Sequence, residues 1–599
     1  MNDITDIHQV KTVALATADE MRERIRRQSK RKGRQPDAVS VAEVRALVGE
    51  APHRRDLLIE HLHKLNDAWR GLHNRHLVAL AVEMNIPMAE VYEVATFYHH
   101  FEVLEDNAQG PGLTVRVCDG LSCQLAGADD LLARLPALLG AGEVPGGIRV
   151  VAAPCIGRCE QAPAVAVGQH AVACATLDTV VSASKWPQAI VKPDDSAINF
   201  DPSSLAEQGV SPSPNPAAVG YDAYRAHGGY ALAAAVVNGE EAAEAIVKAM
   251  EDSGLRGLGG AGFPAGRKWR IVREQPAPKL MAVNIDEGEP GTFKDRTYLE
   301  RDPHRFLEGM LIAAQVVGVE ACYIYLRDEY HACRALLEQA IAHLQADPPC
   351  PLPRIELRRG AGAYICGEES AMIESIEGKR GEPRMRPPYI AQVGLFGRPT
   401  LEHNFETLYW VRDIVEKGPQ WFSGFGRHGR KGLRSFSVSG RVKSPGVKLA
   451  PAGITLQELV DGYCGGMAEG HALYAYLPGG ASGGILPASM ANIPLDFDTL
   501  QPHGCFIGSA AVIVLGNHDK ARDAALNMMR FFEHESCGQC TPCRVGTGKA
   551  ATLMQSAQWD NALLEDLNQV MVDASICGLG QAAPNPVRCV QKYFSHEIG

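Results

Sequence analysis

Eight of the sixteen cysteines in this 599-residue chain form two closely spaced sets, which limit what the chain can fold into. In the first set, four residues separate Cys118 from Cys123, and three separate Cys155 from Cys159. Four thiolates that arrive as two loop pairs can enclose a two-iron cluster, because each iron then takes two sulfur ligands. The gaps are wider than the two-residue gaps common in structural zinc sites, so the spacing favours an iron–sulfur cluster over the zinc alternative.

The second set comprises Cys537, Cys540 and Cys543, with Cys577 thirty-four residues further on. Three cysteines on one tight loop and a distant fourth suit a four-iron cluster, whose ligands converge on the corners of a cube. Gly538 lets this loop approach the cluster because it has no side chain. Zinc is again the alternative. Two clusters in one chain imply a path for single electrons, and such a path needs a two-electron donor or acceptor at one end.

The composition is that of a globular protein, with 46% hydrophobic residues, 22% charged residues and a formal net charge of -11. The longest apolar run, Cys505 to Gly516, is about half the ~20 residues of a membrane-spanning helix. With no secretory signal recognisable, we expect a cytoplasmic protein without membrane contact. Disulfides are disfavoured there, so the eight scattered cysteines are expected to be buried as small hydrophobic side chains. The basic stretch from Arg22 to Arg34 predicts a solvated arm and no binding of nucleic acid.

At this length several domains are expected. Helical apolar spacing from residue 41 to about 103 predicts a small bundle. A strand ending at Cys118, a helix to Leu139, a strand from 148 to 153 and a hairpin predict a small α/β layer. Residues 191–220 are rich in Pro, Ser, Asp and Asn, which predicts a linker. An α/β region, a glycine-rich β region and a helical end follow it.

A glycine-rich run from Gly257 to Trp269 is a candidate for binding a phosphate, because glycines bring backbone N–H groups close and Lys268 adds a positive charge. It is not the usual dinucleotide fingerprint, since a helical stretch precedes it and a strand follows it. Taken alone, it could be only a flexible loop. The Gly546–Lys549 segment fails as a phosphate loop, because Ala550 stands where a hydroxyl residue is required.

Two further stretches strengthen this candidate site. Asn284 to Pro290 closes a predicted strand with three carboxylates and an amide, which could hold the hydroxyl groups of a ribityl or ribose chain. Gly360 to Ser370 is a second glycine turn with an aromatic ring and two adjacent acids. For Glu368 and Glu369 there is a structural alternative, since acids stabilise the start of a helix regardless of function.

With these motifs on one chain, the region after the linker resembles the flavin-bearing, NADH-binding subunit of respiratory complex I. The residues that carry the resemblance are Leu255 to Trp269, Asn284 to Asp295, Gly360 to Ser370 and the C-terminal cysteine set. Residues 41–185 resemble the small two-iron subunit of that complex, fused ahead of the larger one.

A fusion of these two subunits is similar to the β subunit of molybdenum- or tungsten-dependent, NAD-linked formate dehydrogenases. The diaphorase subunit of soluble NAD-reducing hydrogenases shares the plan, although some of those subunits lack the N-terminal cysteine set that this chain keeps. The stretches Arg55 to His63 and Leu326 to Tyr330 look closest to the formate enzyme.

The resemblance implies a multidomain fold of α/β and α parts. The domains expected from the sequence are a basic tail (1–40), a helical bundle (41–110), a thioredoxin-like 2Fe-2S domain (111–190), a linker (191–220), a Rossmann-like FMN- and NAD-binding domain (221–435), a ubiquitin-like β domain (436–515) and a helical 4Fe-4S domain (516–599).

The resemblance also implies roles for particular residues. The nucleotide would be reduced at a catalytic site containing Lys268, Glu289 and Glu369, with Phe263 stacked on an aromatic ring. The residues implied to bind FMN or the nucleotide are Gly257, Gly259, Gly260, Phe263, Lys268, Asn284, Asp286, Glu287, Glu289, Tyr364, Gly367, Glu368, Glu369, His403, Asn404 and Thr407.

Three positions depart from the family pattern. His403 stands where asparagine is usual, which puts one flavin contact in doubt. Tyr389 replaces a common phenylalanine and keeps an aromatic face, and Leu258 replaces an arginine in the glycine run. None of the three removes a predicted cluster ligand.

The predicted function is NAD reduction within a formate dehydrogenase complex. Electrons from formate oxidation on a molybdenum- or tungsten-containing partner, which carries further clusters, would pass to FMN and leave as hydride to NAD⁺. FMN is the implied converter, because NAD takes two electrons at once and clusters carry one at a time. The alternatives are a diaphorase of a hydrogenase or of a complex I-like enzyme, and a zinc scaffold without redox function.

Overall fold

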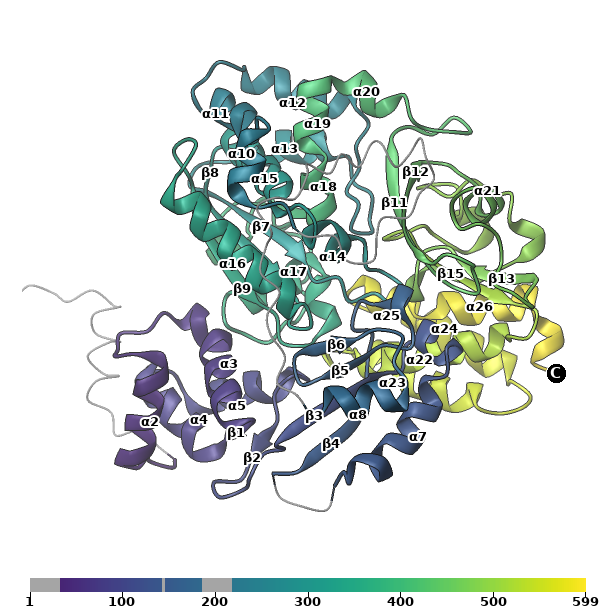
Figure 1. Ribbon diagram of the computed structural model, residues 1–599, viewed down its shortest axis with the longest axis horizontal. Coiled ribbons are helices and arrows are strands. Elements are labelled where there is room, and N and C mark those ends of the chain that lie inside the picture. The colour runs from purple at the N-terminus through teal and green to yellow at the C-terminus, as the bar shows by residue number, and fades with distance from the viewer. Residues whose placement is uncertain (1–32, 143–145, 186–217) are drawn as a thin grey trace, which may run out of the picture.

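The computed structural model describes residues 33–142, 146–185 and 218–599 (Figure 1). Most of the predicted basic tail, and residues 191–217 of the predicted linker, therefore lie outside the described residues. The first helix of the described residues, α2, begins at Ala38, before the expected boundary at residue 41. Asp37 caps it, because its Oδ1 accepts a hydrogen bond from the backbone N–H of Ser40 at 2.8 Å.

A helical bundle forms the first described part of the chain. Helices α2 and α4 pack on each other, and α3 and α5 complete the bundle, so that Leu62, Leu77 and Val91 are fully buried. The elements are α2 (Ala38–Val48), η1 (Arg55–Leu57), α3 (Leu58–Trp69), β1 (Leu72–His73), α4 (Asn74–Glu83), α5 (Met88–Phe97) and β2 (Val103–Leu104). The bundle predicted from helical spacing is confirmed, with a short parallel β1–β2 pair added.

The next part is a four-stranded sheet in the order β4-β3-β5-β6. Strands β3 and β4 are parallel, and β5 and β6 form the antiparallel hairpin that the sequence predicts. The elements are β3 (Leu113–Cys118), α6 (Leu121–Leu125), α7 (Ala128–Leu139), β4 (Ile148–Ala153), η2 (Cys159–Gln161), β5 (Val165–Val167), β6 (His170–Val172) and α8 (Leu177–Ala183).

After the gap, helices surround a parallel sheet in the order β10-β7-β8-β9. The elements are α10 (Tyr221–Ala226), α11 (Ala231–Val237), α12 (Ala243–Asp252), α13 (Ala265–Arg273), β7 (Lys279–Ile285), α14 (Lys294–Leu299), α15 (Pro303–Val317), β8 (Val319–Leu326), α16 (His331–Ala346), β9 (Arg354–Arg359), η3 (Tyr364–Gly367), α17 (Glu369–Ile376), η4 (Leu395–Gly397), β10 (Thr400–Asn404), α18 (Phe405–Tyr409), α19 (Val411–Lys417) and α20 (Pro419–Ser423). The strand order reverses at β7, because β8 and β9 follow it on one side and β10 returns on the other. Such a reversal leaves a crevice at the carboxyl ends of the strands, where α/β proteins bind ligands.

A mixed five-stranded sheet follows, in the order β12-β11-β15-β13-β14. Its elements are β11 (Leu433–Gly440), β12 (Gly446–Pro451), α21 (Leu456–Tyr463), β13 (Leu473–Leu477), η5 (Ala481–Gly483), β14 (Leu486–Pro487), η6 (Ala488–Met490), η7 (Gln501–His503) and β15 (Ala511–Gly516). The longest apolar run of the sequence thus ends in β15, a strand buried along its whole length.

The chain ends in helices. They are α22 (Ala521–His534), α23 (Thr541–Met554), α24 (Asn561–Ala574), α25 (Gly578–Ala582), α26 (Pro584–Tyr593) and η8 (Ser595–Glu597). Although far apart in sequence, this end and the four-stranded sheet after the bundle lie side by side (Figure 1). Asn527 of α22 joins them: its Nδ2 donates to the carbonyl of Asp119 at 2.9 Å and to Gln124 Oε1 at 3.1 Å.

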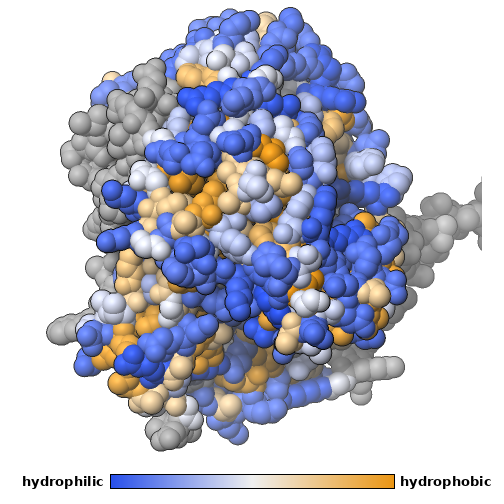
Figure 2. Space-filling view, turned by 90° about the vertical axis from the view of Figure 1, so that its right-hand side faces the viewer, coloured by the Kyte–Doolittle hydropathy of each residue, from blue (hydrophilic) through white to orange (hydrophobic). Residues whose placement is uncertain are grey.

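No helix in the described part of the chain is long and apolar enough to span a membrane. Figure 2 shows a face on which hydrophobic side chains form separate patches among hydrophilic ones, with no continuous apolar band.

Candidate redox centres

The four cysteines of the first set meet at the carboxyl ends of β3 and β4. Cys118 ends β3, Cys123 lies in α6, Cys155 lies between β4 and η2, and Cys159 is the first residue of η2. Because β3 and β4 are parallel neighbours, both pairs leave the sheet at the same edge. All four thiols are buried, and the sulfur atoms of Cys155 and Cys159 are 3.3 Å apart. The backbone N–H of Gly157 donates to Cys155 Sγ at 3.4 Å, which favours a thiolate there.

Hydrogen bonds within this set shift the pKa values of three of its thiols, those of Cys118, Cys155 and Cys159. Those from Cys118 and Cys159, with the nearby charge of Arg327, hold the pKa of Cys155 well below its ordinary value. The pKa of Cys118 is raised by its hydrogen bonds with Cys123 and Cys155, and that of Cys159 by its bond with Cys155. Thiolates are the form that binds metal, so a cluster would replace these shared protons with positive iron.

The second cysteine set lies at the starts of two helices. Cys540 immediately precedes α23, Cys543 lies in its first turn, and Cys577 immediately precedes α25. Cys543 is buried and the other three are partly exposed. They lie close together, because Cys540 and Cys537 contribute to raising the pKa of Cys543, and Cys537 contributes to raising that of Cys577. The pKa of Cys577 is raised to about 12, mainly by burial and to a smaller extent by Cys537. A Cβ on Gly580 would lie 2.9 Å from the Cβ of Cys543, so this packing leaves no space for a side chain.

The predicted flavin site lies where the strand order reverses. Asn284 near the end of β7 and Asn404 at the end of β10 are directly paired across the sheet. Asn284 Nδ2 donates to the carbonyl of Gly367 at 2.8 Å, which ties β7 to the second glycine turn. Asn404 donates to Asp295 Oδ2 at 2.7 Å and caps α18 through the N–H of Glu406 at 3.1 Å. The two amides thus join strand ends, turn and helix start into one frame.

The first glycine run packs directly on this frame. The N–H of Gly257 donates to the carbonyl of Phe263 at 2.8 Å, which closes the run into a loop before α13. A Cβ on Gly259 would lie 2.9 Å from the Cβ of Asn404, so only glycine lets the loop come so close. Gly260 has a φ of 149°, and a Cβ there would meet open space. The loop is packed against the frame at Gly259 and faces open space at Gly260. This geometry favours a binding site for a phosphate or a flat ring over a loop that is only flexible.

Two residues beside this loop were predicted to bind the cofactor or the nucleotide. Phe263 is 39% exposed, and its ring lies under the guanidinium of Arg267 at 5.7 Å. Thr407 is buried and accepts a hydrogen bond from the N–H of Leu258 at 3.0 Å. Leu258, the position that departs from the family arginine, is itself buried and packs in the core. Phe263 is therefore free to stack, while Thr407 holds the loop.

Lys268, in α13, reaches the same edge of the sheet and keeps its charge there. Its Nζ lies 2.9 Å from Glu402 Oε2 and 3.0 Å from the carbonyl of Glu402. Burial pulls the pKa of Lys268 down, but Glu402 and Glu369 outweigh it, so the pKa is raised. Conversely, burial raises the pKa of Glu369 against the opposing charge of Lys268. Glu369 also pairs with Arg386 at 3.0 Å.

The carboxylates after β7 point to different partners. Asp286 Oδ2 is buried without a hydrogen-bond partner in the described structure, and burial raises its pKa well above the ordinary value. An orphaned buried oxygen at this place fits a ligand hydroxyl. Glu287 is fully occupied: it accepts from the N–H groups of Asp295 at 2.8 Å and Arg296 at 3.1 Å, and from Tyr330 at 2.8 Å. It therefore caps the start of α14.

Glu289 joins the flavin region to the five-stranded sheet. Its Oε1 accepts hydrogen bonds from the N–H and the hydroxyl of Ser482, both at 2.8 Å, and its Oε2 accepts one from Tyr364. Burial raises its pKa; the Tyr364 and Ser482 bonds oppose this, and the Cys155 thiolate adds to it. The N–H of Tyr364 in turn donates to Glu535 at 2.9 Å, two residues before Cys537. Glu289 and Tyr364 thus lie between the two cysteine sets.

Glu368 has the structural role that was the alternative for it. It is the N-cap of α17, and its Oε2 accepts from the N–H groups of Ser370 at 3.0 Å and Ala371 at 2.9 Å. Its other oxygen pairs with Arg386, so the carboxylate also lies at the rim of the site. Gly367 completes the turn, and a Cβ added to it would lie only 3.2 Å from the carbonyl oxygen of Asp286.

His403 is buried one position before Asn404 and lies behind the site. Its Nε2 accepts a hydrogen bond from Trp269 Nε1 at 2.8 Å. Burial, with the charge of Lys268, holds its pKa well below the ordinary value, so the ring is neutral. The structure therefore shows His403 bound to the indole of α13, where it supports the helix that carries Lys268.

Three residues of the site were not predicted. Arg327 donates to the carbonyls of Cys155, at 2.6 Å, and Glu287, and so links the first cysteine set to the flavin region. Glu402 holds Lys268, and Ser482 holds Glu289. Ser482 lies in a run with four glycines between residues 479 and 484, which was a usable signal. Arg327 lies in the stretch Leu326 to Tyr330 noted for its family resemblance, but nothing in that stretch or around Glu402 indicates a contact with the site.

Models of three families match successive parts of the chain. The thioredoxin-like [2Fe-2S] ferredoxin model matches residues 44–183, the Nuo51 FMN-binding domain model matches 250–413, and the NADH-ubiquinone oxidoreductase-F iron-sulfur binding region matches 523–599. Together with the observed helices and sheets, these matches confirm the predicted multidomain fold class.

Curated relatives match about three fifths of the chain. An NADH-quinone oxidoreductase subunit of Rhizobium meliloti is 41% identical over 391 residues, which are 63% of this chain and 92% of that protein. The mitochondrial NADH dehydrogenase [ubiquinone] flavoprotein 1 of Dictyostelium discoideum is 42% identical, over 59% of this chain and 78% of that protein. Among solved structures, an NAD⁺-reducing [NiFe]-hydrogenase in the H2-reduced state matches with a TM-score of 0.76 at 31% identity, over 91% of this chain and 92% of that one.

Proposed function

This chain belongs to the family of the NADH-quinone oxidoreductase flavoproteins, and we propose that its own place is as the NAD-reducing subunit of a formate dehydrogenase. The family membership establishes the coarser part of this function. The chain is an NADH-binding flavoprotein that transfers electrons between iron–sulfur clusters and FMN, as a subunit of a larger complex. Its cofactors are FMN, NAD(H), one 2Fe-2S cluster and one 4Fe-4S cluster.

The proposed ligands of the clusters are the two cysteine sets. Cys118, Cys123, Cys155 and Cys159 would hold the 2Fe-2S cluster, and Cys537, Cys540, Cys543 and Cys577 would hold the 4Fe-4S cluster. What supports this is that each set converges in the fold from two separate segments. Arg327 and the N–H of Gly157 would stabilise the negative charge on sulfur at the first cluster.

FMN is proposed to lie in the crevice between β7 and β10. Gly257, Gly259 and Gly260 would receive it, and the orphaned Oδ2 of Asp286 would accept a hydrogen bond from a ribityl hydroxyl. When bound, the flavin supplies the exchange between a hydride and single electrons. Asn284, Asn404 and Gly367 form the frame on which it would rest, and the hydrogen bonds of this frame would help to fix its position.

The nucleotide is proposed to enter on the side of Phe263. This exposed ring would stack on an aromatic ring of the nucleotide, and Lys268 would offer its charge to a phosphate. Glu289, held by Ser482 and Tyr364, and Glu369, beside Lys268, would orient the ribose and nicotinamide. No side chain needs to donate or accept a proton in the hydride step, so these residues bind and position.

The formate substrate is supported by the resemblance of two stretches, Arg55 to His63 and Leu326 to Tyr330, to the formate enzyme. The fusion of both subunits and the complete N-terminal cysteine set are consistent with it. Formate oxidation would take place in the cytoplasm on a molybdenum- or tungsten-containing partner with further clusters, because the sequence of this chain contains no recognisable molybdopterin or nickel site. The hydrogenase alternative has support of its own, because the match to an NAD⁺-reducing hydrogenase runs over 91% of the chain.

The deciding experiment is NAD⁺ reduction by the natively purified complex, offered formate and hydrogen separately under anaerobic conditions. We expect NADH to form with formate only, and molybdenum or tungsten to copurify in stoichiometric amount. NADH formation with hydrogen and copurified nickel would reject the formate proposal in favour of the hydrogenase alternative. A native complex that uses neither donor would also reject it and leave the coarser function standing.

A further inference from the structure

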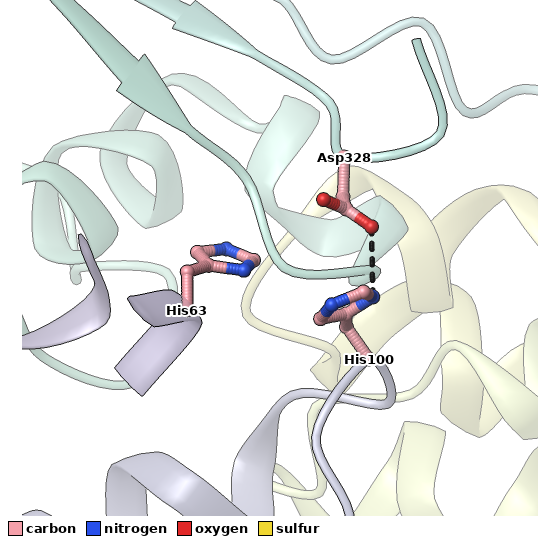
Figure 3. A group of neighbouring side chains, drawn as sticks. All are labelled: His63, His100 and Asp328. Atoms are coloured by element: carbon pink, nitrogen blue, oxygen red, sulfur yellow. Dashed lines mark ion pairs between the residues drawn. The ribbon is translucent and has the colours of Figure 1, made fainter. Parts of the chain in front are cut away.

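Two histidines and an aspartate form a cluster at the contact between the N-terminal bundle and the flavin region. Figure 3 shows them converging from three segments: His63 from α3, His100 from the loop after α5, and Asp328 from the loop after β8. The potential ligand atoms lie within 4.8 Å of one another. His63 and Asp328 are only 2% and 6% exposed. None of the three belongs to the flavin site or the cysteine sets.

His63 has the hydrogen-bonding pattern of a metal ligand. Its Nε2 lies 2.8 Å from the carbonyl oxygen of Gly360. A carbonyl only accepts, so Nε2 carries the proton, and Nδ1 of the neutral ring has a free lone pair. That Nδ1 is buried and has no hydrogen-bond partner among the described residues. Metal-binding histidines commonly donate their other N–H to a backbone carbonyl, which fixes the ring.

A buried carboxylate faces the two histidines, and its other oxygen is held by an arginine. His100 Nδ1 lies 2.7 Å from Asp328 Oδ2, so one carboxylate oxygen already faces the histidines. The other oxygen accepts from Arg359 Nε at 2.5 Å. Arg359 also pairs with Asp67 at 2.6 Å, so its single positive charge is shared between two carboxylates. Arg116 and Arg334 also act electrostatically on Asp328, so the cluster offers a cation a buried carboxylate and two imidazoles rather than an excess of negative charge. The place is buried, and an ion interacts strongly with such ligands there.

We propose that His63, His100 and Asp328 bind a zinc-type divalent cation. Two imidazoles and a carboxylate are ligands that zinc accepts, at roughly 2.0–2.2 Å each. Ligands of a tetrahedral ion then lie roughly 3.4 Å apart. The 2.7 Å contact between His100 Nδ1 and Asp328 Oδ2 would therefore open slightly, its shared proton being displaced by the ion, and the wider separations, at most 4.8 Å, would close. Zinc transfers no electrons, so the ion is structural.

A fourth ligand is close by. His331, the first residue of α16, lies with its Nε2 3.9 Å from Asp328 Oδ2, and its Nδ1 is buried without a partner in the described structure. A shift of this ring, or a water molecule, completes the coordination. Structural zinc sites are usually closed by four protein ligands, which favours His331.

The ion would fasten the bundle to the second glycine turn. His63 is bonded to the carbonyl of Gly360, and the N–H of His100 donates to the carbonyl of Ala361 at 3.1 Å. Both residues precede Tyr364 in the turn that carries part of the flavin site. This role is independent of the identity of the partner subunit, so it stands whether formate or hydrogen is the electron source.

The test measures zinc in the full-length protein with its FMN and clusters. Wild type and the His63→Gln and Asp328→Asn variants are dialysed anaerobically against zinc chloride, then against a weak chelator. Zinc, iron and FMN are then measured per chain. We expect about one equivalent of tightly bound zinc in wild type, as for a single closed site, and at least a fivefold loss in both variants. Zinc X-ray absorption of wild type should show nitrogen and oxygen ligands near ~2.0–2.1 Å.

A matched control comes from the same bundle. His76 is fully buried with an unpartnered Nδ1, and its Nε2 contacts Glu43 at 2.9 Å. Among the described residues, however, it does not belong to a group of three potential metal ligands. His76→Gln should keep its zinc. Equal zinc in wild type, His63→Gln and Asp328→Asn, or a sulfur shell at about 2.3 Å that indicates zinc in the cysteine sites, overturns the proposal. If a variant loses iron and FMN through misfolding, the ligand shell of wild type still decides it.

Discussion

Replacing Lys268 with methionine is the sharpest test of the nucleotide site. Methionine has nearly the length of lysine and keeps an apolar stem, but it carries no charge. The raised pKa of Lys268, which Glu402 and Glu369 maintain against burial, keeps it charged throughout the pH range of an assay. The substitution therefore removes the positive charge that we place against a nucleotide phosphate, and leaves the two acids without their shared partner.

The size of the effect follows from the kind of contact. A hydrogen bond to a charged group contributes about 1.5–3 kcal/mol. At 1.4 kcal/mol for each factor of ten, its loss corresponds to a decrease of roughly 10- to 150-fold in kcat/KM for NADH. Glu402 would also lose its 2.9 Å ion pair, and its repulsion of Glu369 adds to the loss. We expect the change mainly in KM, because the lysine binds the nucleotide in both its oxidation states.

The assay is NADH:ferricyanide activity, expressed per bound FMN so that flavin loss does not imitate nucleotide loss. Lys279→Met is the matched control. Lys279 begins β7 at the opposite end of the sheet, and its Nζ donates to the carbonyls of Arg273 at 2.7 Å and Val317 at 3.2 Å. This variant should unfold at lower temperature with an unchanged KM. If Lys268→Met has the kcat/KM of wild type per flavin, the site assignment is wrong.

Three further outcomes are expected. Gly259→Ala should lower FMN content, because the new Cβ would lie 2.9 Å from the Cβ of Asn404 and such overpacking costs about 1–3 kcal/mol; released flavin fluorescence measures it. Burial, with Asp295 nearby, raises the pKa of Glu287 to about 7, so the folded protein holds this proton more tightly than the unfolded chain does. The resulting contribution to the free energy of unfolding, up to about 3 kcal/mol, is present at pH 4.5 and is lost as the pH rises to 7. Glu287→Gln should therefore flatten the fall in Tm over this range; an equally steep fall would contradict the assignment. Cys155→Ser should abolish the electron paramagnetic resonance of the 2Fe-2S cluster and spare the 4Fe-4S signal, while Cys577→Ser should do the reverse; loss of both signals in either variant would argue against two independent sites.

The parts of the fold that were predictable are those with local patterns. The strand from Ile148 to Ala153 and the strand ending at Cys118 were predicted with their observed bounds, because alternation and flanking turns mark them. The convergence of each cysteine set followed from spacing, since a cluster needs its ligands together. The helical spacing was placed from residue 41, whereas α2 begins at Ala38, because the cap at Asp37 lies within the residues assigned to the tail.

Roles that depend on long-range contacts could not be read from the sequence. Glu287 and Glu289 lie two residues apart and looked alike as hydroxyl-binding acids. In the fold, Glu287 caps α14, whereas Glu289 meets Ser482, almost two hundred residues away in the chain. His403, similarly, faces the indole of Trp269. No local pattern distinguishes a carboxylate that holds a helix from one that faces a ligand, because the partner is supplied by another element.

These long-range contacts also explain how three centres can keep a fixed geometry. Arg327 bonds the loop of Cys155 to the carbonyl of Glu287, and Tyr364 bonds Glu289 on one side and Glu535, near Cys537, on the other. Each bond joins a segment of one cofactor site to a segment of the next. Precise placement of reacting groups requires side chains that are themselves locked by further contacts. Because Arg327 and Tyr364 are each shared by two sites, a change at either should disturb cluster and flavin together, which distinguishes them from residues that serve one centre alone.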